Sequence, residues 1–170
     1  RGWVRDYTYK TGIIRTKTRA GEADSVYSMY YDYREPVRQL PSHRILAINR
    51  GEREEYIKVE IEVEREVITS RIIERYIKKD NSPAAELVKK AIIDGYKRLI
   101  EPAVARDIRN GLTEDAEAQA IVVFSKNLRS LLLQPPVRGK TVLGVDPAYR
   151  TGCKWAIVDE TGKMLEAGVV

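Results

Sequence analysis

The chain has 170 residues, a formal net charge of +5, 43% hydrophobic and 32% charged residues, and one cysteine. This length accommodates one full domain, or one domain with part of another. The composition is typical of a globular protein, no apolar run approaches the roughly 18 residues of a membrane span, and a single cysteine excludes an internal disulfide. We therefore expect a cytoplasmic protein that makes no membrane contact.

The positive charge is concentrated in the first 50 residues, which hold ten Lys or Arg against five Asp or Glu and six of the ten tyrosines. Cations interleaved with aromatic side chains are typical of surfaces that bind a nucleic-acid backbone and stack on bases. The same pattern arises when tyrosines pack internally and the cations are merely solvated. If the first interpretation holds, Arg15, Lys17 and Arg19 are the expected nucleic-acid contacts.

The first third of the chain predicts short elements. Residues 1–10 predict a helix that ends at Gly12, and the polar residues 12–25 that follow predict an extended segment or a loop. A compact helix is then expected with Ser42 as its N-cap and Gly51 as its terminator.

A strand and a helix follow. The stretch YIKVEIEVE at 56–64 alternates apolar and charged residues, which predicts a half-buried strand, and residues 12–18 are a candidate partner for it. The segment 65–79 then repeats apolar residues at helical spacing.

Two long helices are expected next, packed as an antiparallel pair. Ser82 and Pro83 start the first, Pro102 predicts a kink near 98–101, and Gly111 ends it. Thr113 is the expected cap of the second. Its expected buried side consists of five apolar residues: Ile121, Phe124, Leu128, Leu131 and Leu132.

The last 30 residues have a sequence pattern that differs from that of the helical segments before them. TVLGV, KWAIVD and KMLEAGVV predict three short strands joined by tight turns, which indicates an antiparallel meander. The prolines at 135 and 136 and the Arg138-Gly139 pair mark the expected boundary between a helical region, 1–138, and this sheet, 139–170. The predicted fold class is α+β, predominantly α-helical, with a truncated sheet at the end.

Asp146 is the one candidate catalytic residue. It ends the TVLGV strand immediately before Pro147, and an Asp-Pro pair commonly ends a strand for purely structural reasons. The functional interpretation is a metal ligand, but two-metal phosphoryl chemistry needs several carboxylates around its cations. The other acid of this region, Asp159, is expected at the far end of the neighbouring strand. We therefore expect no catalysis and no cofactor.

Long contiguous stretches resemble the Tex family of bacterial transcription accessory proteins. The resemblance rests on PSHRILAINRGE, on the run from YKRLIEPAVARDIRNGLTEDAE to WAIVDETGK, and above all on LGVDPAYRTGCK. It implies that residues 1–138 form the mainly helical Tex-like central region, with one short β element near 56–64. Residues 139–170 would then be the first strands of a YqgF-type, RNase H-like domain. It also implies that Asp146 stands at the position of the first-strand acid of RNase H-like nucleases.

The resemblance leads to three hypotheses about function. The first is an RNA- or DNA-binding transcription accessory protein of the Tex type, present here as a fragment with no catalysis of its own. The second is a metal-dependent nuclease or resolvase of the RNase H-like superfamily, with Mg²⁺ held in part by Asp146. The third is a non-catalytic scaffold that docks onto RNA polymerase or the ribosome.

Overall fold

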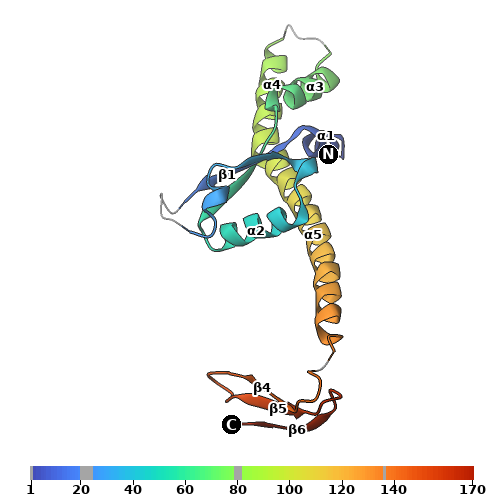
Figure 1. Ribbon diagram of the computed structural model, residues 1–170. Helices are drawn as coiled ribbons and strands as arrows, with labels where there is room; N and C mark the ends of the chain where they lie inside the picture. Colours follow the sequence, from blue (N-terminus) through green and yellow to red (C-terminus); the bar gives the residue numbers. More distant parts are fainter. Residues whose placement is uncertain (1, 20–24, 79–81, 136) are drawn as a thin grey trace. The chain divides into compact units, whose positions relative to one another are not determined.

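The chain forms two compact units, Arg1–Val122 and Val123–Val170, in the computed structural model (Figure 1). The structure describes residues 2–19, 25–78, 82–135 and 137–170. Parts of the expected extended segment (20–24) and of the expected proline boundary (136) lie outside these residues. The first unit combines helices with a small antiparallel sheet, and the second contains a three-stranded antiparallel meander. The predicted α+β class is confirmed.

The sheet of the first unit has the strand order β2-β1-β3. The central strand β1 (Ile13–Thr18) pairs antiparallel with β3 (Ile57–Glu62) over its whole length and with β2 (Arg34–Pro36) at its start. The strand predicted from the alternating sequence and its candidate partner are therefore both confirmed. The short strand β2 was not expected from the sequence.

The register of the sheet separates a core face from a charged face. Ile14 lies opposite Ile61, and Thr16 opposite Val59, on the core face, whereas Arg15 lies opposite Glu60 on the other face. Thr16 is fully buried. Its hydroxyl donates to the carbonyl of Tyr30 and accepts from the amide of Tyr33 at 3.1 Å, which satisfies a polar group that would otherwise be costly to bury.

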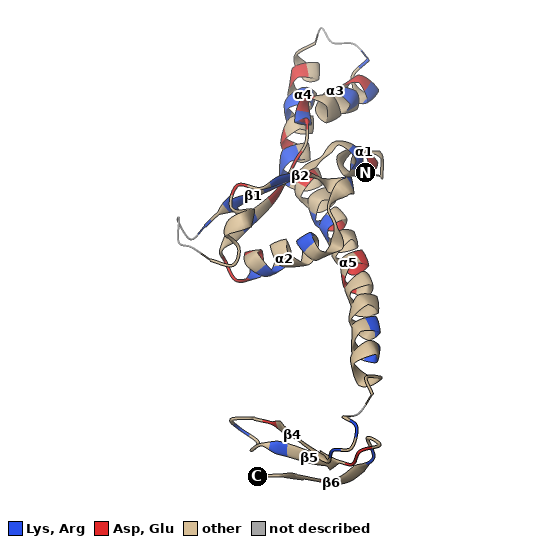
Figure 2. Cartoon of the chain, viewed as in Figure 1, with Lys and Arg blue, Asp and Glu red and all other residues tan. Residues whose placement is uncertain are grey.

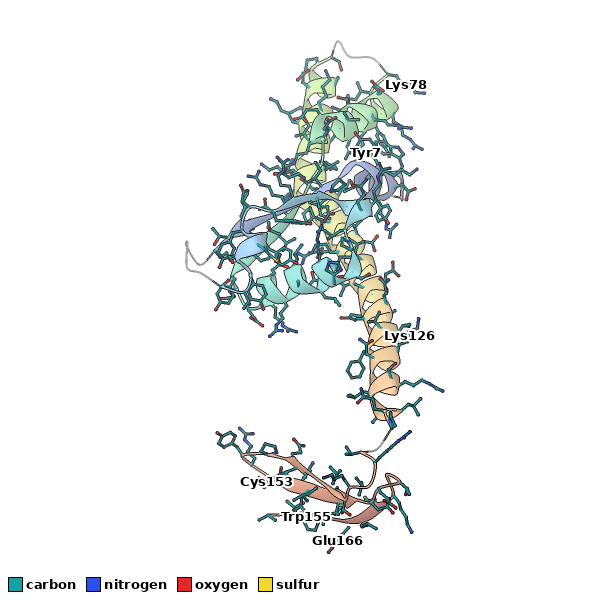
Figure 3. The ribbon with its side chains drawn as sticks, in the orientation of Figure 1. Tyr7, Lys78, Lys126, Cys153, Trp155 and Glu166 are labelled. Carbon is teal, nitrogen blue, oxygen red and sulfur yellow. The ribbon has the colours of Figure 1, made fainter. Side chains whose placement is uncertain are left out.

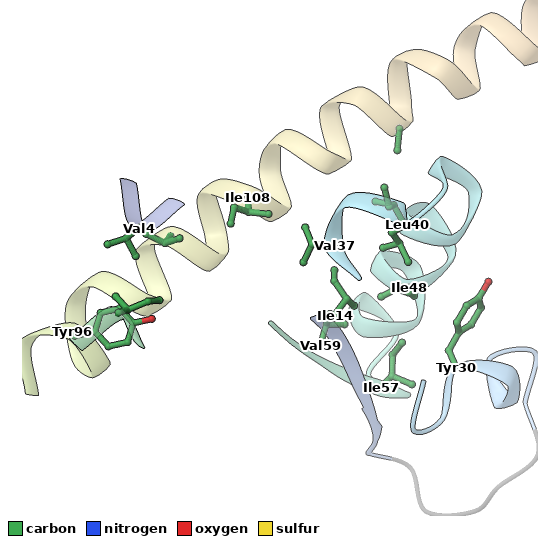
Figure 4. Close-up of a cluster of buried hydrophobic side chains, with 14 residues drawn as sticks. Val4, Ile14, Tyr30, Val37, Leu40, Ile48, Ile57, Val59, Tyr96 and Ile108 are labelled. Atoms are coloured by element: carbon green, nitrogen blue, oxygen red, sulfur yellow. The ribbon is translucent and has the colours of Figure 1, made fainter. Parts of the chain in front are cut away.

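Helices from distant parts of the first unit surround the core face. They are α1 (Gly2–Thr11), α2 (Ser42–Arg53), α3 (Arg65–Tyr76) and the first half of α5 (Glu101–Leu132), and two short 3-10 turns add Tyr30 and Val37. Figure 4 shows the resulting cluster of buried side chains. Its members are Val4, Ile14, Tyr30, Val37, Leu40, Ile45, Ile48, Ile57, Val59, Ile68, Tyr96, Val104, Ile108 and Ala116.

The ends of α2 differ from the prediction. Pro41, rather than Ser42, occupies the N-cap position, and the helix continues past Gly51 to Arg53. Gly51 is buried because α2 approaches the sheet closely there. A Cβ at this position would lie 3.0 Å from Tyr27 Cδ1 and 3.2 Å from Ile57 Cδ1. This glycine provides space for packing and does not end the helix.

The prediction of two long helices packed as an antiparallel pair is wrong. Helix α4 (Pro83–Gly95) leads through a π-helical turn, η3 (Tyr96–Ile100), directly into α5. Gly111 and Thr113 both lie inside α5, where the Thr113 hydroxyl donates to the carbonyl of Arg109 at 2.8 Å. The irregularity expected at 98–101 is present as η3, because Pro102 has no N–H to continue the α-helical bonding pattern.

The prediction that one side of residues 121–132 is buried is also wrong. Phe124 is 66% exposed, and the other four residues of the predicted set are exposed as well. The last buried residue of α5 is Ala116. The apolar stripe of the sequence therefore continues beyond the part of the helix that packs on the core.

The second unit holds β4 (Val142–Asp146), β5 (Lys154–Val158) and β6 (Met164–Val169), in that order. Both pairs of neighbours are antiparallel, as expected. Trp155 on β5 lies over Gly168 on β6, where a Cβ would come within 2.7 Å of the indole ring. Among the helices described across both units, none combines the length and apolarity that a membrane span requires.

Candidate nucleic-acid interface

The cations predicted to contact nucleic acid belong to β1 or directly follow it, and Figure 2 colours the Lys and Arg positions of this strand blue. Arg15 Nη1 is 2.8 Å from Glu62 Oε1, and Lys17 Nζ is 3.2 Å from Glu60 Oε2. Arg19 is exposed just beyond β1, and its backbone N–H donates to the Tyr56 carbonyl at 2.8 Å. Two of the three predicted cations are therefore already paired with carboxylates.

Neighbouring cations lower the pKa of two carboxylates on β3. The hydrogen bond from Arg15 lowers the pKa of Glu62, and hydrogen bonds from Lys58 and then Lys17 lower the pKa of Glu60. Both acids are therefore ionised at neutral pH and offset the positive charge of this face. A phosphate approaching it would have to compete with them.

The tyrosines of the first 50 residues are used mainly in packing. Tyr27 and Tyr30 are buried, Tyr27 contacts Tyr56 at a ring-centroid distance of 5.3 Å, and Tyr30 meets Tyr33 edge-on at 5.5 Å. Tyr9 is exposed, at 40%. The interpretation that the tyrosines pack internally is therefore the better description of this segment.

A second group of cations lies between α2 and α5, in a pocket of about 350 Å³ that we call the arginine pocket. It is lined by Asn49, Glu52 and Arg53 of α2 and by Arg106, Arg109, Asn110 and Thr113 of α5. Three of these seven residues are arginines and one is an acid. Its charge is therefore positive.

Hydrogen bonds hold the inner wall of the arginine pocket. Arg109 Nη2 donates to Glu52 Oε2 and, at 3.2 Å, to Asn49 Oδ1. Asn49 Nδ2 in turn donates to Thr113 Oγ1 at 2.8 Å. These bonds tie α2 to α5 and place the one acid of the pocket against Arg109.

The two outer arginines of the pocket have a different environment. Arg53 and Arg106 are both exposed, and neither forms an ion pair with a residue that the structure describes. Guanidinium groups in this state are suited to phosphate, which they can bind through two parallel hydrogen bonds. This pair was not evident from the sequence, because Arg53 and Arg106 come together only through the packing of α2 on α5. The segment ARDIRN does carry a signal, since it places Arg106, Arg109 and Asn110 on one helical face.

Asp146 lies at the end of β4, exposed and opposite Lys154. Asp159 lies beyond the opposite end of this strand pair, where Val142 meets Val158. Its Oδ1 accepts bonds from the Thr161 amide at 2.8 Å and hydroxyl at 2.6 Å, and these bonds lower its pKa.

Asp159 therefore stabilises a turn, as its expected place at the far end implied. In the described part of the chain, no three residues among His, Cys, Asp and Glu converge in a way that could hold a metal ion. The described residues near Asp146 do not fit a two-metal centre, which needs several carboxylates.

These features define a protein with a helix-rich, sheet-containing unit and an antiparallel meander that matches the opening strands of an RNase H-like domain. Residues 1–124 match the Tex central region, and residues 140–170 match the YqgF-like domain of Tex proteins. The chain belongs to the Tex family.

Several relatives support this assignment. The chain is 49% identical to the YdcI protein of Bacillus subtilis over all of its own length and 24% of that protein. It is 34% identical to Protein tex of Bordetella pertussis over 98% of its length and 23% of that protein. It is 36% identical to the human S1 RNA-binding domain-containing protein 1 over 85% of its length and 15% of that protein. The chain thus spans a quarter or less of each of these relatives.

Proposed function

We propose that the chain contributes a nucleic-acid contact to a transcription accessory protein of the Tex type, and that the arginine pocket makes this contact. The observation that carries the proposal is the exposed pair Arg53 and Arg106 beside the amide of Asn110, with no ion pair to a described residue. Relatives named for transcription and for an S1 RNA-binding domain support the same class of function.

Phosphate is the part of the nucleic acid that this pocket fits. The exposed arginines supply planar donors, the Asn110 amide adds a further donor, and the pocket offers no exposed aromatic ring for stacking on a base. The contact should therefore depend weakly on base sequence and strongly on salt concentration. Arg15, Lys17 and Arg19 would add to it only after their own carboxylate partners are displaced.

The test is a binding titration of a fluorescent single-stranded RNA and its DNA equivalent at several salt concentrations. In Arg53→Gln/Arg106→Gln we expect weaker binding and a shallower dependence on salt. Each lost phosphate contact should reduce the slope of log affinity against log salt by about 0.7. The matched variant Arg15→Gln/Lys17→Gln/Arg19→Gln should lose less. Unchanged affinity and slope in Arg53→Gln/Arg106→Gln would remove the arginine pocket from the proposal.

The nuclease alternative rests on Asp146, which ends the first strand of the meander. We propose that the chain itself has no such activity, because the described residues supply one carboxylate where two-metal chemistry needs several. Incubation of the chain with Mg²⁺ or Mn²⁺ and single-stranded, duplex and junction substrates tests this. Cleavage that disappears in Asp146→Asn would establish the alternative instead.

A further inference from the structure

One edge of the three-stranded sheet has no strand beside it. Strand β3 pairs with β1 alone, so its other edge is open in the part of the chain that the structure describes. An open edge presents unpaired N–H and C=O groups, which can accept a further strand. This edge lies on a cleft of about 900 Å³, which extends beyond the arginine pocket and shares Arg106 and Arg109 with it.

The direction of the β3 backbone groups follows from two hydrogen bonds. The Val59 N–H donates to the side chain of Glu52 at 3.2 Å, so it points away from β1. The Tyr56 carbonyl accepts from Arg19 across the β1–β3 pair. Because the direction alternates along a strand, the odd-numbered residues of β3 face the open edge. The Ile61 N–H and C=O and the Val59 C=O are therefore available for pairing.

The cleft follows this edge. Six consecutive residues, 58–63, line it, and since neighbouring side chains of a strand point to opposite faces, the cleft must run along the strand's edge. The opposite wall is one face of η3 and α5. Pro102 and Ala105, which have short side chains, lie between Lys97 and Arg106 along this wall.

Ion pairs close both ends of the cleft and neutralise most of its charge. Arg65 Nε lies 2.8 Å from Glu101 Oε1 at one end, and Arg109 pairs with Glu52 at the other. On the strand side, Lys58 Nζ lies 2.7 Å from Glu60, and Glu62 pairs with Arg15 and Arg34.

Two cations of the cleft have no carboxylate partner among the described residues. Lys97 and Arg106 are exposed on the helical wall and form no ion pair with a described residue. The one acid of the lining outside these pairs, Glu66, belongs to α3 near the Arg65 end. The wall that faces the open strand edge is therefore positive.

We propose that this cleft binds an extended, acidic segment of a protein partner, which adds to β3 as an antiparallel fourth strand. Its backbone pairs with Val59 and Ile61, and small or β-branched side chains on one face pack toward Pro102 and Ala105. Its carboxylates stand on the same face, two residues to either side of these apolar side chains, and reach Lys97 and Arg106. This is recognition by strand addition, in which the backbone bonds supply affinity and the flanking side chains supply specificity.

A synthetic pentapeptide Asp-Thr-Val-Thr-Asp, acetylated, amidated and fluorescently labelled, is a direct probe, because its Asp and Val side chains share one face of a strand. We expect saturable binding to the 170-residue chain, with increased hydrogen-exchange protection of the Ile61 amide. In antiparallel addition with the Asp and Val side chains toward the helical wall, the Asp and Val N–H groups face β3 and the Thr N–H groups face away. N-methylation of the Val residue should therefore abolish binding, whereas N-methylation of the two Thr residues should preserve it.

Charge reversal tests the helical wall. Lys97→Glu/Arg106→Glu should weaken binding of this peptide at least about tenfold, or 1.4 kcal/mol, and should favour the peptide Lys-Thr-Val-Thr-Lys. The matched control is Lys126→Glu/Arg129→Glu, which changes the net charge equally on the exposed end of α5, where Figure 3 labels Lys126. It should leave affinity nearly unchanged.

Three results would overturn the proposal. They are the absence of saturable binding up to about 1 mM peptide, equal binding of the peptide N-methylated at Val, and equal weakening by the two charge-reversal variants. If RNA is bound through the arginine pocket while the peptide is not bound at all, the nucleic-acid proposal stands and the strand-addition proposal fails. Arg53→Gln separates the two sites, because Arg53 lines only the arginine pocket.

Discussion

At the scale of single residues, burial decides which side chains determine stability. Ile57 is fully buried under α2, where it approaches Gly51, and it belongs to the core cluster. Phe124 is larger but 66% exposed. The energetic effect of truncating a side chain follows the apolar area removed from water and the cavity left behind, so the larger residue here should be the less important one.

We therefore predict that Ile57→Ala lowers the free energy of unfolding of the first unit by about 2–5 kcal/mol. Phe124→Ala should change it by less than about 0.5 kcal/mol, as is usual for exposed positions. Urea denaturation of the two variants, followed by far-ultraviolet circular dichroism, makes the comparison under identical conditions. A larger loss for Phe124→Ala would mean that this part of α5 is covered.

At the scale of elements, residues 83–132 show how far local sequence signals determine the ends of helices. Gly111 and Thr113 resemble a helix end followed by a helix start, yet both lie inside α5. An internal glycine costs about 1 kcal/mol relative to alanine. Buried Ile108 and Ala116, on either side of it, anchor the helix to the core and offset that cost.

This arrangement predicts that Gly111→Ala is stabilising. The backbone there is helical, and the atom nearest to an added Cβ is the flexible Arg5 Nη2, at 3.9 Å. We expect a gain of about 0.5–1 kcal/mol in the free energy of unfolding. Thermal and urea denaturation measure it, and Gly51→Ala, where the added atom meets Tyr27 and Ile57, is the contrasting variant. A loss of stability in Gly111→Ala would contradict a helical backbone at residue 111 and would support the helix end predicted there from the sequence.

The same comparison shows what the sequence could predict. The strand at 57–62 followed from alternation, because a two-residue period has one structural meaning over six residues, whereas its partner at 13–18 was only a candidate. The exposed half of α5 could not be predicted, since an apolar stripe looks the same whether or not it is covered. The arginine pocket could not be predicted either. It forms only where α2 packs on α5, and no local sequence pattern indicates that contact.

At the scale of the whole molecule, the two units differ in how their strands are supported. Every buried side chain that the structure describes belongs to the first unit, the last being Ala116. The strands β4, β5 and β6 form an antiparallel ladder, with one irregularity between Ile157 and Val158, but carry only partly or weakly buried side chains, such as Trp155 and Ile157. Hydrogen bonding is thus similar in the two sheets, while apolar burial is not.

We therefore predict that backbone amides of β1 and β3 exchange with deuterium far more slowly than those of β4–β6. Local opening is favoured where few apolar contacts must be broken, whatever the number of ladder hydrogen bonds. Hydrogen exchange of the 170-residue chain, read by mass spectrometry and corrected for intrinsic rates, compares the two sheets in one sample. Ile57→Ala should accelerate exchange in β1 and β3 and leave β4–β6 unchanged, because the two strand sets belong to separate units. Equal protection of both sheets, or joint acceleration in this variant, would show that the meander shares the stability of the first unit.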